Sequence, residues 1–182
     1  MTEFITLDGV VEAPGGGDHP HAGWTFKDVP FEEAAYDIKG REQEEASALL
    51  LGRVSHDEFA PVWPQMAEFA AYNAMPKYVV SSTLQGSDWQ HTHVLRSLDE
   101  VAALKESDAD GDGPIYVHGS ATLAQGLLAA GLVDRLHLLV FPLLLGSGKR
   151  LFSDSGSKVD LQLVETATYG NGITLQVLDV VR

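Results

Sequence analysis

The sequence predicts an α/β fold in which helices cover both faces of a mostly parallel β-sheet. Short apolar runs that suit buried strands, such as residues 49–51 and 115–118, alternate with helical segments along the chain. Near the C-terminus, Gly170-Asn171-Gly172 separates two stretches of alternating apolar and polar residues, a pattern typical of a β-hairpin. We therefore expect a mostly parallel sheet with a C-terminal antiparallel hairpin.

The first half of the chain supplies strands and two helical segments. The expected strands are residues 4–7, 49–51 and 77–82, and the expected helical segments are residues 31–48 and 57–72. Gly40 weakens the interior of the first helix, and Pro61 and Pro64 interrupt the second segment.

The second half continues the alternation. A capping box from Ser97 to Glu100 predicts a short helix that ends near Lys105, and Gly131 suits the left-handed cap that ends a helix over residues 120–130. The remaining expected strands are residues 115–118, 136–145, 161–169 and 173–181.

Composition limits the classes of function. The chain has 182 residues and suits a single domain over residues 1–182, and it contains no cysteine for disulfides, thiolate metal sites or nucleophilic catalysis. Lys and Arg number 12 against 26 Asp and Glu, so the net charge of −14 argues against a nucleic-acid partner. Without a basic leader or a long apolar run, we expect a cytoplasmic protein with no membrane segment.

Glycine and hydroxyl residues follow three of the expected strands. Gly52-Arg53-Val54-Ser55 follows the strand 49–51, Ser81-Ser82-Thr83 follows the third strand, and Gly119-Ser120-Ala121-Thr122 follows the strand 115–118. Ligands of parallel α/β sheets bind at the carboxyl ends of the strands, where helix N-termini attract anions. Each turn alone also fits a plain loop or helix cap. Together they favour a pocket for a dinucleotide with several phosphates, although no Rossmann or P-loop glycine motif is present.

Five segments in order along the chain resemble the dihydrofolate-reductase-like proteins. They are residues 6–16, 50–57, 77–83, 115–123 and 136–152. The resemblance is closer to the reductase domain of bifunctional riboflavin biosynthesis proteins, the RibD C-terminal domain, and to its stand-alone bacterial relatives. It implies a three-layer α-β-α fold with an eight-stranded mixed sheet, NADPH bound across the carboxyl ends of the strands, and a homodimer.

The resemblance also implies roles for individual residues. Gly52, Arg53, Val54 and Ser55 would meet the adenosine-side phosphates, with Arg53 assigned to the 2′-phosphate. Ser81, Ser82 and Thr83 would flank the 2′-phosphate and ribose, and Gly119, Ser120, Ala121 and Thr122 would wrap the pyrophosphate. Thr6 and the glycine-rich loop after it would lie near the nicotinamide. Asp8 is the predicted catalytic polar contact to the substrate, and a role within its own turn is the alternative.

Two functions are compatible with the sequence. The first is an NADPH-dependent reductase that transfers hydride to a small pterin-like or pyrimidine-like heterocycle of the riboflavin-precursor type. The alternative is a non-catalytic, dimeric protein of the same fold that binds a nucleotide or small ligand. We predict no metal site, because the Asp108-x-Asp110-x-Asp112 pattern lacks the final EF-hand glutamate and the pairs His19/His21 and His91/His93 lack further ligands.

Overall fold

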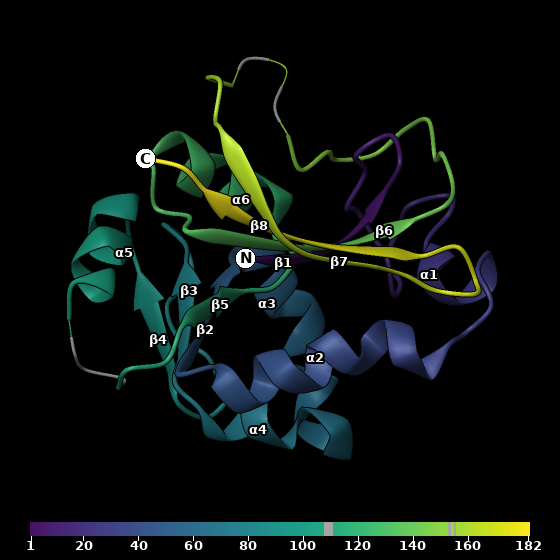
Figure 1. The fold of residues 1–182 in the computed structure, drawn as a ribbon. Helices are drawn as coiled ribbons and strands as arrows, with labels where there is room; N and C mark the ends of the chain where they lie inside the picture. The colour runs from purple at the N-terminus through teal and green to yellow at the C-terminus, as the bar shows by residue number, and fades with distance from the viewer. Residues whose placement is uncertain (108–110, 153, 155) are drawn as a thin grey trace. The chain divides into compact units, whose positions relative to one another are not determined.

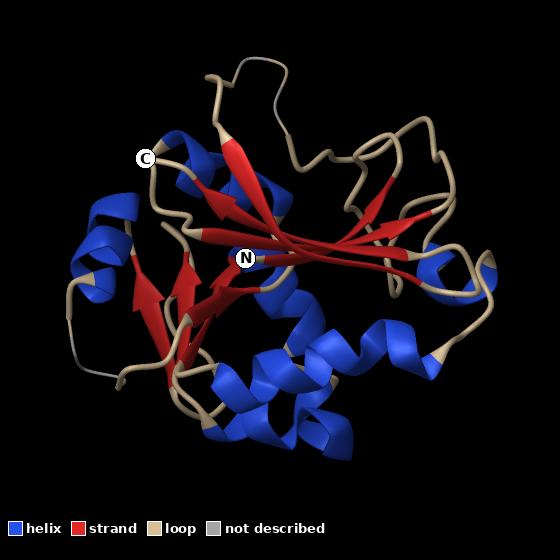
Figure 2. Ribbon diagram, viewed as in Figure 1, coloured by secondary structure: helices blue, strands red, loops and turns tan. Residues whose placement is uncertain are grey.

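The computed structural model describes residues 1–107, 111–152, 154 and 156–182, so Asp108 and Asp110 of the acidic loop lie outside the described residues. The described chain forms two compact units. The first unit combines both ends of the chain, Met1–Ile38 and Ala124–Arg182, and the second is the segment between them, Lys39–Leu123. Figures 1 and 2 show their elements, which are described below one unit at a time.

The first unit contains a mixed four-stranded sheet. Its strands are β1 (Thr2–Thr6), β6 (Arg135–Phe141), β7 (Leu161–Thr168) and β8 (Thr174–Val180), in the spatial order β1-β6-β8-β7. β1 runs parallel to β6, whereas β8 is antiparallel to both β6 and β7. Gly172, with a φ of 86°, lies in the turn between β7 and β8, so the predicted hairpin is confirmed.

Apolar side chains from this sheet and from the flanking helical segments form one core. The contributing helices are α1 (Trp24–Lys27) and the first part of α2 (Glu33–Glu45). The last part of α6 (Ala121–Ala129) also belongs to this unit. The buried cluster contains Trp24, Val29, Ala35, Ile38, Leu139, Phe141, Ile173, Leu175 and Val177. Gly131 has a φ of 67° just after α6, as expected for a left-handed helix cap.

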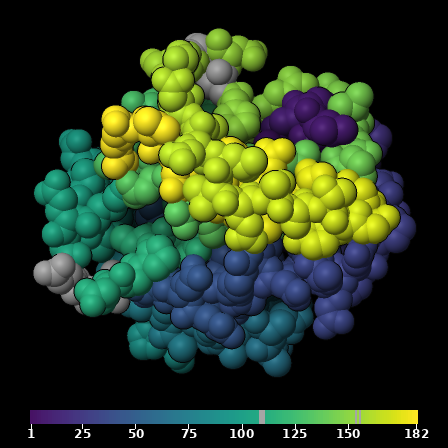
Figure 3. Space-filling view, in the orientation of Figure 1, coloured from purple at the N-terminus to yellow at the C-terminus, as the bar shows by residue number. Residues whose placement is uncertain are grey.

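β7 forms an edge of this sheet and carries exposed apolar side chains. Leu161, Leu163 and Val164 are 39%, 53% and 50% exposed. The yellow-green surface of this segment is visible in Figure 3.

The second unit contains an all-parallel four-stranded sheet. Its strands are β2 (Ala48–Gly52), β3 (Lys77–Val80), β4 (Thr92–Leu95) and β5 (Ile115–Val117), in the spatial order β4-β3-β2-β5. β2 lies in the interior of the sheet and its first four residues are buried, which explains the uninterrupted apolar run at this point of the sequence.

Short helices connect the strands of the second unit. They are α3 (Arg53–Phe59), the 3-10 turns η1 (Trp63–Gln65) and η2 (Ala67–Phe69), α4 (Ala70–Ala74) and α5 (Leu98–Lys105). Ser97 accepts a hydrogen bond from the Glu100 backbone N–H at the start of α5, so the predicted cap is confirmed. The core of this unit contains Leu49, Leu51, Trp63, Tyr72, Val79, Leu84, Trp89 and Tyr116.

The α/β class and the antiparallel hairpin are confirmed, but the arrangement of the strands differs from the expectation. The hydrogen-bond ladders of the described residues form two four-stranded sheets and not one eight-stranded sheet. β5 is only three residues long and has few backbone groups for hydrogen bonds to a neighbouring strand. The strand with which it pairs is β2. β4 was not predicted from the pattern, because this four-residue edge strand is only partly buried and lacks an apolar run. In the described part of the chain, no helix is both long and apolar enough to cross a bilayer.

Candidate functional site

The three predicted turns of the second unit all lie at one edge of its parallel sheet. Gly52 ends β2, Ser81 follows β3, and Gly119 follows β5 by two residues. β3 and β5 are the two neighbours of β2 and run parallel to it, so the carboxyl ends of the three strands point the same way (Figure 1). The structure therefore brings together three segments that are far apart in the sequence.

The Ser120 hydroxyl links two of these turns. Its Oγ accepts a hydrogen bond of 2.8 Å from the Gly52 backbone N–H and donates one of 2.8 Å to the Ser55 Oγ. Ser120 has a φ of 71°, a conformation that is rare for residues with a Cβ and that recurs at functional sites. This bridge holds the start of α3 against the turn that precedes α6.

Close packing explains glycine at two positions of this site. A Cβ on Gly52 would lie 3.2 Å from the Ser120 Oγ, and one on Gly119 would lie 3.3 Å from the Ser55 Oγ. Gly119 also has a φ of 58°, which favours glycine. Glycine at these two positions therefore lets the turns after β2 and β5 pack closely against each other.

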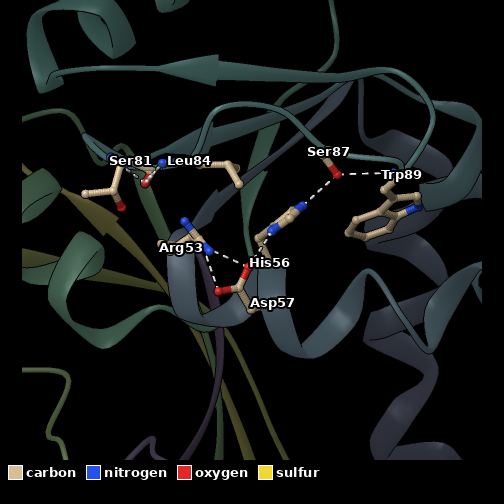
Figure 4. Close-up of polar contacts among 8 residues, drawn as sticks. Arg53, His56, Asp57, Ser81, Leu84, Ser87 and Trp89 are labelled. Carbon is tan, nitrogen blue, oxygen red and sulfur yellow. Dashed lines mark hydrogen bonds and ion pairs between the residues drawn. The ribbon is translucent and has the colours of Figure 1, made fainter.

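Arg53 is held by a chain of polar contacts at the start of α3 (Figure 4). Its Nε donates to both carboxylate oxygens of Asp57, at 2.8 and 2.6 Å. The same carboxylate lies 3.0 Å from the Nδ1 of His56. Burial alone would raise the pKa of Asp57, but the hydrogen bonds from Arg53 and His56 outweigh it and lower the pKa below the usual value. Asp57 is therefore an ionised partner of Arg53 at neutral pH.

The segment after β3 presents two exposed hydroxyl residues. The Ser81 Oγ accepts hydrogen bonds from the backbone N–H groups of Thr83 and Leu84, and its backbone carbonyl accepts one from Arg96. The side chains of Ser82 and Thr83 are exposed. The Ser81 side chain therefore orders its own turn, and the two following residues are the ones that face solvent.

The remaining predicted residues of this group border the two helix starts. Val54 is 59% exposed on the first turn of α3. Ala121 is the first residue of α6, and Thr122 beside it is exposed.

A histidine whose side chain is only 15% exposed lies directly before the Gly119–Ser120 turn. The Nε2 of His118 is 3.0 Å from the Tyr72 hydroxyl, and it is 4.0 Å from the carboxylate of Glu42. Burial is the main cause that lowers the pKa of His118 to about 3; the charge of Lys39 lowers it further and that of Glu42 opposes the shift. His118 is therefore neutral at physiological pH and serves as a hydrogen-bonding group behind the turn.

Thr6 and Asp8 lie in the first unit, at the turn that follows β1. The Thr6 Oγ1 donates a hydrogen bond of 2.6 Å to the Asp8 Oδ1 and accepts one from the Val10 backbone N–H. Asp8 also accepts hydrogen bonds from the backbone N–H groups of Leu145 and Gly146, at 3.2 and 2.8 Å. Its carboxylate thus ties the β1 turn to the loop after β6.

These contacts define the charge of Asp8. Burial would raise the pKa of Asp8, but the hydrogen bonds from Thr6, Gly146 and Leu145 outweigh this effect and lower the pKa to about 2. The guanidinium of Arg150 lies 3.5 Å away. Asp8 is therefore ionised at neutral pH and poorly suited to donate a proton. Its catalytic role stays a prediction, and the alternative role within its own turn matches the contacts observed.

Sequence reasoning missed the residues that support the predicted site. His56, Asp57 and Ser87 are linked to Arg53, and His118 lies behind Ser120, yet none of them had a predicted role. Asp57 had one available signal, because an Arg and an Asp four residues apart on a helix form an ion pair. The others depend on contacts between distant segments. The cofactor-binding roles of the predicted residues stay predictions.

Comparison with known proteins shows the family. The family model described as the RibD C-terminal domain matches residues 1–175. The chain is 28% identical over 179 residues to the uncharacterized protein YyaP of Bacillus subtilis (strain 168), a match that covers 93% of this chain and 87% of that protein. The protein therefore belongs to the RibD C-terminal domain family, which confirms the resemblance read from the five segments.

Two solved structures share the fold. A putative riboflavin biosynthesis protein from Shewanella sp. PV-4 is similar with a TM-score of 0.77 and 19% identity, over 100% of this chain and 97% of that one. A pyrimidine reductase-like protein from Corynebacterium diphtheriae NCTC is similar with a TM-score of 0.66 and 14% identity, over 100% and 90% of the two chains. At these identities the likeness concerns the fold.

Proposed function

We propose that the protein is an NADPH-dependent reductase that transfers hydride to a small pterin-like or pyrimidine-like heterocycle of the riboflavin-precursor type. Membership of the RibD C-terminal domain family supports a reductase. The names of the two similar structures, one a riboflavin biosynthesis protein and one pyrimidine reductase-like, support the class of substrate.

The observation that carries the proposal is the hydroxyl bridge at the carboxyl edge of the parallel sheet. The Ser120 Oγ joins the Gly52 N–H to the Ser55 Oγ, and Arg53 stands beside them. Backbone N–H groups, hydroxyls and one guanidinium are a donor set that suits phosphates. These mostly uncharged donors fit an anionic cofactor into a chain whose net charge is −14.

The proposed chemistry needs little from the protein beyond binding and orientation. NADPH, when bound, supplies a hydride from its nicotinamide ring. The unsaturated heterocycle accepts this hydride at one atom of a C=N or C=C bond, and a proton from water completes the reduction at the other atom. In this scheme the turns that contain Gly52, Ser55, Gly119 and Ser120 line the phosphate groups, while the Gly52 N–H and the Ser120 O–H keep their bonds within the bridge. Arg53 contacts the 2′-phosphate.

Cofactor binding provides the first test. Millimolar NADPH should raise the melting temperature or quench the tryptophan fluorescence of the purified protein, and the absence of both effects would refute the proposal. Arg53→Ala should weaken binding of NADPH more than binding of NADH, because only NADPH carries the 2′-phosphate. Oxidation of NADPH at 340 nm with a panel of pterins and pyrimidines then tests the reaction.

A second candidate is a non-catalytic protein of the same fold that binds a nucleotide. The state of Asp8 favours it, because this carboxylate is ionised and bound by three donors, so it is not available as an acid. Binding of NADPH without its oxidation by any member of the panel would support this candidate over the reductase.

We also propose that the protein forms a homodimer. The exposed apolar residues Leu161, Leu163 and Val164 of the edge strand β7 support an association of this kind. Sedimentation of Leu163→Lys should give a monomer where the unsubstituted protein gives a dimer. A monomeric unsubstituted protein would contradict the proposal.

A further inference from the structure

In the described structure, the Arg53 guanidinium forms hydrogen bonds through only one of its three nitrogens. Its Nε is bound by Asp57, whereas neither Nη1 nor Nη2 has a hydrogen bond within the described ranges. The side chain is 41% exposed. A guanidinium held through Nε still presents the outer N–H groups of its two terminal nitrogens, in the fork that binds phosphate through two hydrogen bonds.

The exposed ion pair is anchored to buried residues. His56, which is 6% exposed, contacts Asp57 through Nδ1 and the Ser87 Oγ through Nε2, at 3.0 and 2.8 Å. The Ser87 Oγ in turn accepts a hydrogen bond from the backbone N–H of the buried Trp89. Figure 4 shows this chain of contacts from Trp89 to Arg53.

The chain of contacts also joins two of the predicted cofactor-binding segments. Arg53, His56 and Asp57 belong to α3, and Ser87 and Trp89 belong to the connection between β3 and β4 that begins with Ser81. Most surface ion pairs contribute little because both side chains must be ordered when they meet. Here the hydrogen bond from His56 orders Asp57 beforehand, so Arg53 loses less freedom on binding a ligand.

We propose that Asp57, supported by His56 and Ser87, is a positioning residue that presents Arg53 to the 2′-phosphate and so determines the preference for NADPH over NADH. This inference rests on the proposed function. It assigns the acidic residue beside a phosphate site a favourable role, although its charge alone would repel the phosphate.

The direction of the change in affinity caused by Asp57→Asn distinguishes a positioning role of this residue from a simple effect of its charge. Asp57→Asn removes one negative charge near the phosphate, so charge alone predicts tighter binding of a 2′-phosphate. Loss of positioning predicts weaker binding. Asp88→Asn is the matched control, since Asp88 is an exposed residue of the same connection as Ser87 and has no hydrogen bond or ion pair in the described structure.

The experiment measures the dissociation constants of 2′,5′-ADP and 5′-AMP by titration calorimetry. We expect the unsubstituted protein to prefer 2′,5′-ADP. Asp57→Asn should reduce this preference about fivefold, which corresponds to the cost of about 1 kcal/mol for ordering one long side chain on binding. His56→Gln interrupts the same chain of contacts one residue further from Arg53. It should also reduce the preference for 2′,5′-ADP. Asp88→Asn should leave the preference unchanged or increase it slightly.

A double-mutant cycle tests whether Asp57 acts through Arg53. In the Arg53→Ala background, Asp57→Asn should have no further effect on the preference. An unchanged or increased preference in Asp57→Asn and His56→Gln, or an equal loss in the Arg53→Ala background, would overturn the positioning role alone. A protein that binds neither nucleotide would instead refute the proposed function and the inference with it.

Discussion

Replacing Asp8 by asparagine should destabilise the protein, and the loss should depend on pH. The carboxylate accepts hydrogen bonds from Thr6 Oγ1, Leu145 N–H and Gly146 N–H. An asparagine side chain retains one acceptor oxygen, but its NH₂ group would face one of these donors. That donor would be left without a partner in a side-chain environment that is only 18% exposed.

The pKa of Asp8 gives the magnitude. The folded protein lowers it from 3.8 to about 2. Since one pKa unit corresponds to about 1.4 kcal/mol, ionised Asp8 contributes about 2.5 kcal/mol to the free energy of unfolding at neutral pH. Because the folded pKa is lower than the unfolded value, this contribution is complete above pH 3.8 and is lost as the pH falls towards 2. At pH 3 it should be about half of its value at pH 7.

Urea unfolding of both proteins at pH 7 and pH 3, followed by circular dichroism, measures the difference. Asp18→Asn is the matched control, because Asp18 is an exposed aspartate that follows the glycines of the same loop. We expect the control to change the free energy of unfolding by less than about 0.5 kcal/mol. If Asp8→Asn behaves like the control, or if its effect is the same at both pH values, the ionised carboxylate does not stabilise the fold through these hydrogen bonds.

Three further predictions concern the stability of the second unit, and urea unfolding tests each. Ser120→Ala should cost about 1–2 kcal/mol by removing the hydroxyl bridge, and Ser120→Gly should cost less because glycine tolerates the φ of 71°; equal losses would contradict this. Gly113→Ala would place a Cβ 2.6 Å from the Glu45 carbonyl oxygen and should cost about 2 kcal/mol or more, whereas Gly86→Ala meets nothing within 4 Å and should be neutral. Lys77→Met should cost about 3 kcal/mol, since this fully buried ammonium donates to three backbone carbonyls at the end of α4; a neutral result would show that the carbonyls find other donors.

The elements that were predicted correctly depend on short-range chemistry. The cap of α5 at Ser97, the left-handed Gly131 after α6 and the turn at Gly172 each follow from residues within one or two turns of the chain. The buried strand β2 also follows from its own apolar run. The carboxyl ends of parallel strands lie at one edge of the sheet. The proximity of the three turns that follow these strands could therefore be predicted as well.

The elements that were missed depend on partners that lie far away in the sequence. β4 is a strand because it pairs with β3, and its own residues do not form an apolar pattern. The partners of Asp8 at Leu145 and Gly146 are separated from it by more than 130 residues. The contact between His56 and Ser87 spans 31 residues. Hydrogen bonds of this kind leave no periodic signal in the sequence.

The net charge follows from the sequence, whereas the effect of an individual charged group on a ligand depends on the tertiary structure. The sequence determines a net charge of −14, and this charge predicts a site that binds its ligand with few formal charges. Whether a given carboxylate repels or assists an anion depends on what surrounds it. Asp8 is bound by backbone N–H groups, and Asp57 is bound by Arg53 and His56, so both are ionised partners of fixed donors. Local chemistry determines the elements and the donor types, whereas the folded chain determines which donors remain for a ligand, because only folding brings the competing partners together.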